Sequence, residues 1–535
     1  MSLTEILLRA LSLWPDEPAV LCGPETLTYR DVADRVGRLA AVLASLGIEK
    51  GDRVAVLHRN CHRMLEAYFA AVHAGAILVP MNHRLTAADL AYILDDTSCR
   101  VMIADDGWSD LAAEAITNSY TPCTPIWSGM GGRAERAVEG PDYESLLEEV
   151  GEQQLSDATS SEDDPANVYY TSGTTGHQKG VVLTHRNISS HALATIAELG
   201  LTDGDTWAHV APMFHLADAW ATWAITWVGG RHVMVGAFDP AAVFQSLTEH
   251  EVTVTNLVPT MLNDLVDHPD SRDVELPAFR LVMSGGAPIS PQLVRRIIDT
   301  FRCEYVQTYG LTETSPYLTF SSLTKKLRRL PPDEQIRYRS MTGRTALGVR
   351  LRLVDDEGND VPADGRTVGE IVARGDRITP GYWRLPDATA EAFRDGWFHT
   401  GDLATVDCEG YFNIVDRKKD VILTGGELVY STEVENTLYD HPAVFEAAVI
   451  GVADDRLGES VVAFVVLRSD VSRGADELSQ HCRDRLAHYK CPRTVGIVEA
   501  LPKTGSGKIS KKALRARCAR ERSARGKTKT LKTKN

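Results

Sequence analysis

Apolar residues recur along the chain with two different spacings. Between residues 29 and 46 they stand three or four positions apart until Gly47 ends the run, which predicts a helix with one buried face. The stretches 53–57 (RVAVL) and 76–80 (AILVP) are short and continuously apolar, which predicts buried strands. A helix-like stretch at 62–74 separates them, so the order is strand, helix, strand.

This alternation continues through the first 400 residues. Strand-like segments recur at Val233–Val235, Val252–Leu257 and Arg280–Met283, each beside a helical pattern. The pattern predicts an α/β fold with parallel sheets covered by helices. Two polar stretches, 151–166 and 324–340, are predicted to be surface connections.

After about Asp407 the chain changes to short strands, glycines and charges, with helices expected near 432–440 and 474–488. This change in pattern predicts a small separate α+β domain. The predicted division is a large N-terminal domain at 1–416, a connection at 417–420, a C-terminal domain at 421–512 and a flexible basic tail at 513–535.

Composition and charge narrow the classes of function. Of the 535 residues 43% are hydrophobic and 24% are charged, as in soluble globular proteins, and no apolar run is long enough for a transmembrane helix. The net charge of −16 disfavours a nucleic-acid-binding body. Residues 511–535 carry +10, which leaves −26 for the rest. Because the tail has no aromatic residue, it is interpreted as the end of a helix followed by a solvated, frayed terminus. A nucleic-acid or lipid arm is the less favoured alternative.

The nine cysteines have irregular spacing and no C-x-x-C pair, which predicts free thiols, no zinc site and a cytoplasmic location. The N-terminus lacks the basic region of a signal peptide. His58 and His62 have the spacing of one helix face but no third ligand nearby. We therefore expect a solvated helix face there in preference to a metal site.

The most specific local signal is YTSGTTGHQKG, from Tyr170 to Gly180. Its glycines let the backbone approach a ligand, its hydroxyls add donors and Lys179 adds a positive charge. The segment predicts a polyphosphate cradle, with an ordinary polar turn as the alternative. It is not a Walker A loop.

Three later segments add complementary chemistry. In SGGAP at 284–288 the side chains are small or absent, so a planar ligand could pack against the backbone. QTYGLTET at 307–314 offers an aromatic ring, a hydroxyl and a carboxylate suited to Mg²⁺. HTGDL at 399–403 offers Asp402 as an acceptor for two ribose hydroxyls. Taken singly, each segment is also typical of a loop with satisfied polar groups.

These segments, together with DRKKDVILTGGELVYSTEVE and PKTGSGKISKK, stand in an order that resembles the adenylate-forming superfamily. That superfamily includes acyl- and aryl-CoA synthetases, luciferases and peptide-synthetase adenylation domains. The resemblance covers about residues 27–514 and implies a large N-terminal domain, a small mobile C-terminal domain and an active site between them. It further implies ATP, Mg²⁺ and coenzyme A (CoA) as cofactors and cosubstrates.

The resemblance also implies a role for each matching residue. Thr171, Ser172, Gly173, Thr174, Thr175, Gly176 and Lys179 would handle the β- and γ-phosphates, and Gly286, Ala287, Pro288 and Tyr309 would flank the adenine. Thr312 would touch the α-phosphate, Glu313 would hold Mg²⁺, Asp402 and Arg417 would bind the ribose, Lys419 would be the hinge, and Lys508 would be the lysine of the last motif.

This chain departs from the family pattern at two positions. Gln178 stands where proline is usual, which leaves the donors of the loop in place, and Asp416 stands where glycine usually precedes Arg417. His215 matches the family's segment beside the acyl pocket, where it would lie near the reacting carbonyl. A core histidine is the alternative. In the family's peptide-synthetase domains, an aspartate usually follows the phenylalanine of this segment and binds the α-amino group of an amino acid. Here His215 follows Phe214, so the resemblance disfavours an amino-acid substrate, although Asp218 keeps that option open.

The sequence thus predicts an ATP-dependent acid–thiol ligase that converts a small carboxylic acid into acyl-AMP and then acyl-CoA. The segments 213–227, 258–264 and 312–318, which are expected to line the acyl pocket, are apolar with few charges and favour an apolar acid. We expect a medium- or long-chain fatty acid, and hence a place in fatty acid metabolism. The alternatives are an aryl acid, transfer to a carrier-protein phosphopantetheine, and a binding module without activity. The partners expected are small molecules and no nucleic acid. A homodimer is compatible with the sequence, which does not decide the oligomeric state.

Overall fold

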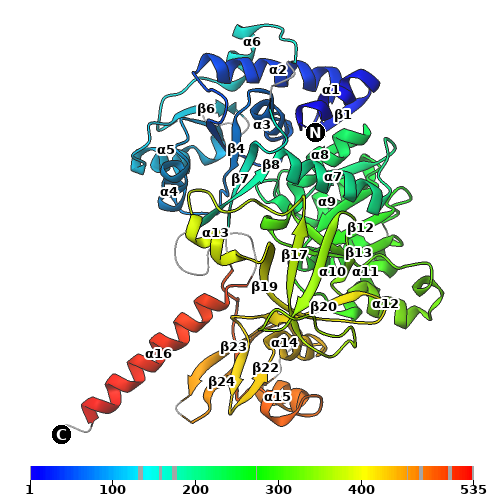
Figure 1. Cartoon of the computed structure of the whole chain (residues 1–535), viewed down its shortest axis with the longest axis vertical. Coiled ribbons are helices and arrows are strands. Elements are labelled where there is room, and N and C mark those ends of the chain that lie inside the picture. The colour runs from blue at the N-terminus through cyan, green and yellow to red at the C-terminus, as the bar shows by residue number, and fades with distance from the viewer. Residues whose placement is uncertain are drawn as a thin grey trace. The chain divides into compact units, whose positions relative to one another are not determined.

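The computed structural model describes residues 2–129, 136–155, 160–171, 178–272, 274–454, 456–468, 474–503 and 509–532, with side chains of the last helix described to Glu521 (Figure 1). The chain divides into two compact units. The first unit comprises Met1–Pro288, Leu293–Leu351 and Ala373–Phe398, and the second comprises Ile289–Gln292, Arg352–Val372 and His399–Asn535.

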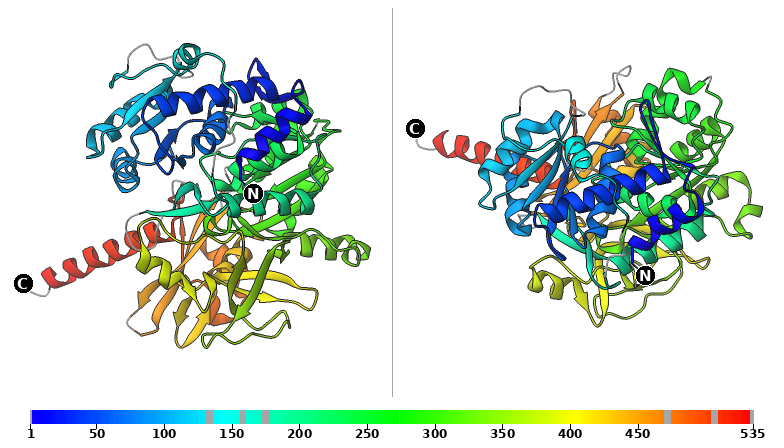
Figure 2. Two further views of the ribbon diagram at one scale, coloured as in Figure 1. Left: turned by 45° about the horizontal axis from the view of Figure 1, so that its top comes forward. Right: turned by 90° about the horizontal axis from the view of Figure 1, so that it is seen from above.

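A six-stranded sheet in the order β6-β5-β3-β4-β7-β8 forms one part of the first unit. Its strands are parallel except for β8, which returns antiparallel to β7. In β3 the buried side chains alternate between two hydrophobic clusters, with Val54 and Val56 in one and Ala55 and Leu57 in the other. Both faces of the sheet are therefore covered, and α2 runs along the outside of this part (Figure 2). The elements are α2 (Tyr29–Ser45), β3 (Arg53–Leu57), α3 (His62–His73), β4 (Ile77–Pro80), α4 (Ala87–Thr97), β5 (Val101–Asp105), η1 (Asp106–Trp108), α5 (Ser109–Asn118), β6 (Thr124–Ser128), α6 (Tyr143–Val150), β7 (Pro165–Thr171) and β8 (Lys179–Thr184).

A second sheet in the first unit runs β15-β14-β13-β12-β11-β9-β10-β1-β2. The strands from β13 to β1 are parallel, so their carboxyl ends meet at one edge, while β14, β15 and β2 pair antiparallel. Such an edge is where parallel α/β sheets bind ligands. The elements are α1 (Thr4–Leu13), β1 (Pro18–Cys22), β2 (Glu25–Thr28), α7 (His185–Leu199), β9 (Thr206–His209), α8 (Leu216–Val228), β10 (Arg231–Met234), α9 (Pro240–Glu249), β11 (Val254–Leu257), α10 (Pro259–Asp267), η3 (Pro269–Arg272), β12 (Leu281–Ser284), α11 (Pro291–Phe301), β13 (Glu304–Gly310), η4 (Thr312–Thr314), β14 (Tyr317–Phe320), η5 (Leu327–Arg329), α12 (Pro332–Ser340), β15 (Gly343–Thr345), α13 (Pro386–Ala392) and β18 (Phe393–Arg394).

The second unit holds the neighbouring strands β19 and β20 and a separate sheet in the order β22-β21-β24-β23, with β25 beside β24. Strand β17 lies between β16 and β19, and both β16 and β17 cross from one unit to the other. The elements are β16 (Val349–Val354), β17 (Gly369–Gly375), β19 (Trp397–Val406), β20 (Tyr411–Arg417), β21 (Ile422–Thr424), β22 (Glu427–Val429), α14 (Ser431–Tyr439), β23 (Val444–Asp454), β24 (Gly458–Leu467), α15 (Ala475–Arg483), η6 (His488–Lys490), β25 (Thr494–Ile497) and α16 (Lys511–Lys532).

The predicted α/β class is confirmed, and so are the early helices and strands to within one or two residues. The predicted surface connection at 324–340 is wrong in part, because η5 and α12 lie within it. Helix α12 begins at Pro332, has Asp333 and Glu334 in its first turn and ends among arginines, an arrangement that suits the helix dipole. Its sequence shows no apolar periodicity, because only Ile336 on it is buried.

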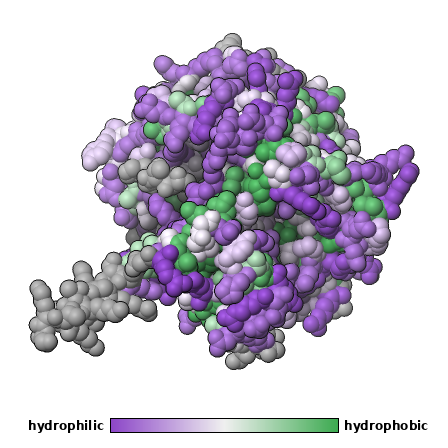
Figure 3. All heavy atoms as spheres, turned by 60° about the horizontal axis from the view of Figure 1, so that its bottom comes forward, coloured by the Kyte–Doolittle hydropathy of each residue, from purple (hydrophilic) through white to green (hydrophobic). Residues whose placement is uncertain are grey.

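The surface is mostly hydrophilic on the face drawn in Figure 3, with hydrophobic atoms in separate groups. All nine cysteines are free thiols. Within the described ranges, no helix combines the length and the apolar character that crossing a membrane requires.

The expectation that His58 and His62 lie on a solvated helix face is wrong. Both side chains are buried, with 1% and 2% of their surface exposed. His58 Nε2 lies 2.7 Å from Ser128 Oγ, and His62 Nδ1 lies 2.6 Å from Glu66 Oε1. Each imidazole therefore has a polar partner inside the fold.

Glu66 is the centre of this buried network. Its carboxylate is fully buried and accepts hydrogen bonds from Arg35 Nε at 2.8 Å and from the Tyr143 hydroxyl at 2.6 Å. Burial alone would raise the pKa of Glu66, but the hydrogen bond to His62 and the charge of Arg35 outweigh it and lower that pKa to about 2. The folded state therefore favours the ionised carboxylate.

We predict that Glu66→Gln lowers the free energy of unfolding by about 3 kcal/mol at pH 7, because the charge partners of the carboxylate remain buried without it. Because the folded pKa lies below the ordinary value, the contribution is complete above about pH 4.5 and disappears as the pH falls toward 2. Urea unfolding of both proteins from pH 7 to pH 3 measures this. The control Glu249→Gln, at an exposed position, should change stability by less than about 0.5 kcal/mol. A difference that grows with acidity would contradict the account of Glu66.

Candidate active site

The segment predicted to bind phosphates joins β7 to β8. These strands form an antiparallel hairpin in which Thr171 pairs with Lys179, and both side chains are partly buried. Ser172–Gly176 lie outside the described residues, so their role stays a prediction. The structure brings the Thr171 hydroxyl and the Lys179 ammonium to the same end of the hairpin.

The glycine-rich turn predicted to flank the adenine leaves the carboxyl end of β12. Gly286 has φ +82°, a conformation that glycine adopts without strain, and Gly286, Ala287 and Pro288 are exposed. Ser284 of β12 pairs in parallel with Gln307 of β13, whose Nε2 donates to the Ala287 carbonyl at 2.9 Å. The turn is thus fixed to β13, the strand that carries Tyr309.

Strand β13 continues into the short helix η4, which carries Thr312 and Glu313. Tyr309, Thr312 and Glu313 are all partly buried. A Cβ atom at Gly310 would overlap the carbonyl oxygen of Pro316, so the chain needs glycine at the point where the strand turns into η4. Tyr309, Thr312 and Glu313, which are predicted to contact the adenine, the α-phosphate and the metal, thus lie within five consecutive positions at one edge of the sheet.

Tyr382 connects the lysine and the glutamate. Its hydroxyl donates to Glu313 Oε1 at 2.9 Å, and the Lys179 Nζ lies 5.0 Å from the centre of its ring. Burial and the neighbouring charge of Glu313 raise the pKa of Tyr382, so the hydroxyl stays protonated. Sequence reasoning missed this residue because it lies outside the six motifs and 69 positions beyond Glu313.

His215 stands immediately before α8 and is partly buried. The loop that leads to it is held from two sides: Met213 N donates to Asn60 Oδ1 at 2.8 Å, and the Tyr68 hydroxyl donates to the Met213 carbonyl at 2.7 Å. The rings of Phe214 and His215 lie 4.6 Å apart. The position of His215 is therefore well defined, and its role in gating stays a prediction.

Asp218, which kept the amino-acid option open, lies in the core. It is fully buried, with Oδ2 2.6 Å from His209 Nδ1 and Oδ1 accepting from Trp207 Nε1 at 3.3 Å. Burial raises the pKa of Asp218. Both oxygens are therefore committed to neighbouring side chains, which removes Asp218 as a ligand for a substrate amino group.

In the second unit, Asp402 and Arg417 pair across β19 and β20. Arg417 Nε lies 3.1 Å from Asp402 Oδ1, and the Asp402 side chain is only 5% exposed. The backbone N–H of Gly401 donates to Glu370 Oε1 at 3.1 Å, and Lys418 Nζ lies 3.5 Å from Glu370 Oε2. The two residues predicted to bind the ribose are thus brought together within one unit.

The predicted hinge residue Lys419 lies two positions after the last residue of β20, Arg417, and is exposed. Its neighbour Asp420 is buried and forms an ion pair with Arg515 of α16, with Oδ1 and Nη1 2.8 Å apart. Lys508 lies outside the described residues, shortly before α16 begins at Lys511. Its role stays a prediction.

The residues of the first unit fit a magnesium nucleotide. A carboxylate oxygen is the ligand that Mg²⁺ prefers, and this ion usually takes one or two protein carboxylates together with phosphate oxygens and water. Glu313 offers such a carboxylate, and Lys179 offers a cation for the phosphates. In the part of the chain that the structure describes, no three histidine, cysteine or carboxylate side chains gather into a metal site.

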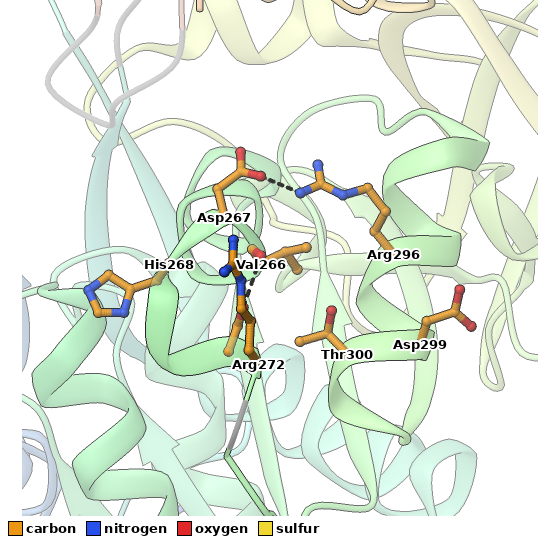
Figure 4. Close-up of a pocket in the computed structure, with 8 residues that line it drawn as sticks. Val266, Asp267, His268, Arg272, Arg296, Asp299 and Thr300 are labelled. Atoms are coloured by element: carbon orange, nitrogen blue, oxygen red, sulfur yellow. Dashed lines mark hydrogen bonds and ion pairs between the residues drawn. The ribbon is translucent and has the colours of Figure 1, made fainter. Parts of the chain in front are cut away.

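A separate hollow of about 430 Å³ lies among α10, η3 and α11 (Figure 4). It contains none of the predicted site residues, and Arg296 on its wall is paired with Asp267. The lining residues are Val266, Asp267, His268, Ser271, Arg272, Arg296, Asp299 and Thr300.

Two family models match the chain. The family model described as AMP-binding enzyme matches residues 7–383, and that of the AMP-binding enzyme C-terminal domain matches residues 433–508. A feruloyl-CoA synthase from an Amycolatopsis species is 38% identical over 511 residues, which cover 95% of this chain and 97% of that protein. The 4-hydroxybutyrate–CoA ligase 2 of Metallosphaera sedula is 32% identical over 516 residues, covering 95% and 92%.

Among solved structures, the anthranilate CoA ligase AuaEII in complex with anthranoyl-AMP superimposes with a TM-score of 0.86 at 25% identity, over 97% of both chains. The fold and the reaction class predicted from the motifs are thereby confirmed. The chain belongs to the AMP-binding enzyme family, the adenylate-forming superfamily, and is an AMP-forming acid–thiol ligase that uses ATP, Mg²⁺ and CoA.

Proposed function

We propose that the acid activated by this ligase is aromatic. The observation that carries the proposal is the feruloyl-CoA synthase relative, which matches the chain at 38% identity along nearly its whole length. The similar anthranilate CoA ligase is also named for an aromatic acid. The 4-hydroxybutyrate–CoA ligase relative favours an aliphatic acid, so the fatty acid expected from the apolar segments is the alternative.

Aromatic side chains beside His215 support this choice. The His83 ring stacks on Trp108 at 4.2 Å with planes 19° apart, and its edge meets Phe214 at 4.8 Å. Burial, together with the charge of Arg84, lowers the pKa of His83 to about 4, so the ring is neutral at pH 7. Neutral aromatic surfaces suit a flat apolar acid through offset and edge-on contacts.

The reaction proceeds in two steps. The acid attacks the α-phosphorus of ATP, giving acyl-AMP and pyrophosphate, and the CoA thiol then attacks the mixed anhydride and expels AMP. A carboxylic acid with a pKa near 4 to 5 is already ionised at pH 7, so the first step requires no general base. The difficulty is that one anion must approach another, and the site must supply charge and orientation.

In the first unit, the proposed roles are those that the family resemblance implies for the matching residues. Thr171 and Lys179 hold the phosphates from the end of the β7–β8 hairpin, and Tyr309 and the 286–288 turn flank the adenine. Thr312 contacts the α-phosphate and Glu313 holds Mg²⁺. When bound, Mg²⁺ neutralises phosphate charge and orients the leaving pyrophosphate.

In the second unit, Asp402 and Arg417 bind the ribose. The proposed domain division has residues 421–512 rotating about Lys419 between the two steps. Lys508 then serves adenylation only, because it enters the site in one orientation and leaves it in the other. This two-orientation scheme rests on the family resemblance.

We predict that an aromatic acid such as ferulate or benzoate gives a kcat/KM at least about tenfold above that of octanoate or palmitate, since the aromatic side chains beside His215 should contact a flat acid more favourably in the transition state. Acyl-CoA and AMP are measured by chromatography with each acid. A higher kcat/KM for the fatty acids would show that the substrate is a fatty acid. If the thioester forms only on a phosphopantetheinyl carrier protein, that protein and not CoA is the acceptor. ADP and phosphate as products would contradict the reaction class.

We predict a split effect for Lys508→Ala. Adenylation should slow about a hundred- to a thousandfold, because a cation that offsets two approaching anions is lost. Thioester formation from supplied acyl-AMP and CoA should stay within about tenfold of the unchanged enzyme. Lys419→Pro should do the converse, since a fixed φ hinders rotation. Equal slowing of both half-reactions by Lys508→Ala, with an unchanged melting curve, would contradict the scheme.

A further inference from the structure

Residues 379–383, the crossing segment, follow β17 and cross two other segments of the first unit. On one side, Val182 N of β8 donates to the Gly381 carbonyl at 3.1 Å, and Trp383 N donates to the Gly180 carbonyl at 2.7 Å. On the other side, Thr379 N donates to the Glu313 carbonyl at 2.8 Å. The crossing segment thus ties the strand that begins with Lys179 to the helix that carries Glu313.

Tyr382 lies at the middle of this arrangement and repeats the connection with its side chain. Its hydroxyl donates to Glu313 Oε1 at 2.9 Å, and its ring lies under Lys179 Nζ at 5.0 Å. Its backbone bridges to Val181, and its N–H donates to Thr389 Oγ1 at 3.0 Å. Because the backbone is held at both of these contacts, the ring and the hydroxyl have a defined place.

We propose that Tyr382 is a positioning residue for the magnesium nucleotide, orienting the Glu313 carboxylate toward the metal and the Lys179 ammonium toward the phosphates. The inference rests on the proposed roles of Glu313 and Lys179. A hydrogen bond to one carboxylate oxygen fixes the plane of the carboxylate, which fixes the direction of its remaining lone pairs. A ring face beneath an ammonium attracts it and restricts a long flexible side chain.

The expected effect is on affinity for the metal-bound nucleotide. Removing a side chain that orients a metal ligand typically weakens metal binding about 10- to 100-fold. The Tyr382→Phe enzyme keeps the ring and loses the hydroxyl, so its Kd for α,β-methylene-ATP in the presence of Mg²⁺ should rise about tenfold. Its Kd for the same analogue in EDTA should stay within about twofold, because the ring still holds Lys179. In Tyr382→Leu, which loses the ring as well, the Kd in EDTA should also rise, by about threefold.

Calorimetric titration of the full chain measures these constants without relying on turnover. The matched control is Tyr143→Phe, because the Tyr143 hydroxyl donates to Glu66 at 2.6 Å and the substitution deletes the same kind of hydrogen bond elsewhere in the unit. That control should lower the melting temperature and leave the magnesium dependence of binding unchanged. If Tyr382→Phe melts more than about 5 °C below the unchanged enzyme, Tyr382→His, which keeps a ring and a donor, should bind the magnesium nucleotide more tightly than Tyr382→Leu.

Glu313→Gln separates the two ways in which the inference can fail. If Glu313→Gln abolishes the magnesium-dependent gain in affinity and Tyr382→Phe leaves it unchanged, Glu313 holds the metal and Tyr382 does not position it. If neither substitution changes that gain, the proposed metal role of Glu313 is wrong, and the inference falls with it. The inference is supported if each single variant loses magnesium-dependent affinity for the nucleotide and the double variant loses no more than Glu313→Gln alone.

Discussion

Repulsion between like charges governs this active site. A carboxylate anion must come within bonding distance of a phosphorus that is surrounded by anionic oxygens, and at such a distance the repulsion is large unless cations lie between. The protein carries a net charge of −16, so the field of the whole molecule does not attract ATP. The positive charge has to be local and held in place, which makes the position of a few side chains decisive.

The fold of the first unit meets this requirement with three segments distant in sequence. The β7–β8 hairpin brings Lys179 to the end where β7 connects to β8. The parallel strands β12 and β13 bring the glycine-rich turn and η4 to one edge, and the crossing segment joins the hairpin to η4 by backbone hydrogen bonds. Gly310, at the end of β13, permits the close approach of the Pro316 carbonyl, which follows η4. Because main-chain contacts set the geometry, the cationic and anionic side chains need little reorganisation when the nucleotide binds.

Much of the fold and of the candidate site could be predicted from the sequence, because the patterns that predict them are local. The alternation of helix and strand, the ends of α2, β3 and α14, and the family motifs each occupy a few neighbouring residues. The residues that the sequence did not predict correctly depend on contacts between positions far apart in the chain. Tyr382 has no distinctive spacing, and only the fold reveals that its hydroxyl meets Glu313. Likewise His62 looks like a surface group, and Asp218 like a possible ligand for a substrate amino group, until the buried partners Glu66 and His209 are seen.

The most direct test of the central claim is a crystal structure with Mg²⁺ and α,β-methylene-ATP bound. The account predicts a Glu313 carboxylate oxygen about 2.1 Å from the metal, with phosphate oxygens and water as the other ligands. It also predicts the Lys179 ammonium within hydrogen-bonding distance of a phosphate oxygen, about 2.8 Å. A nucleotide whose metal is held by other side chains, with Glu313 and Lys179 both out of reach of the phosphates, would contradict it.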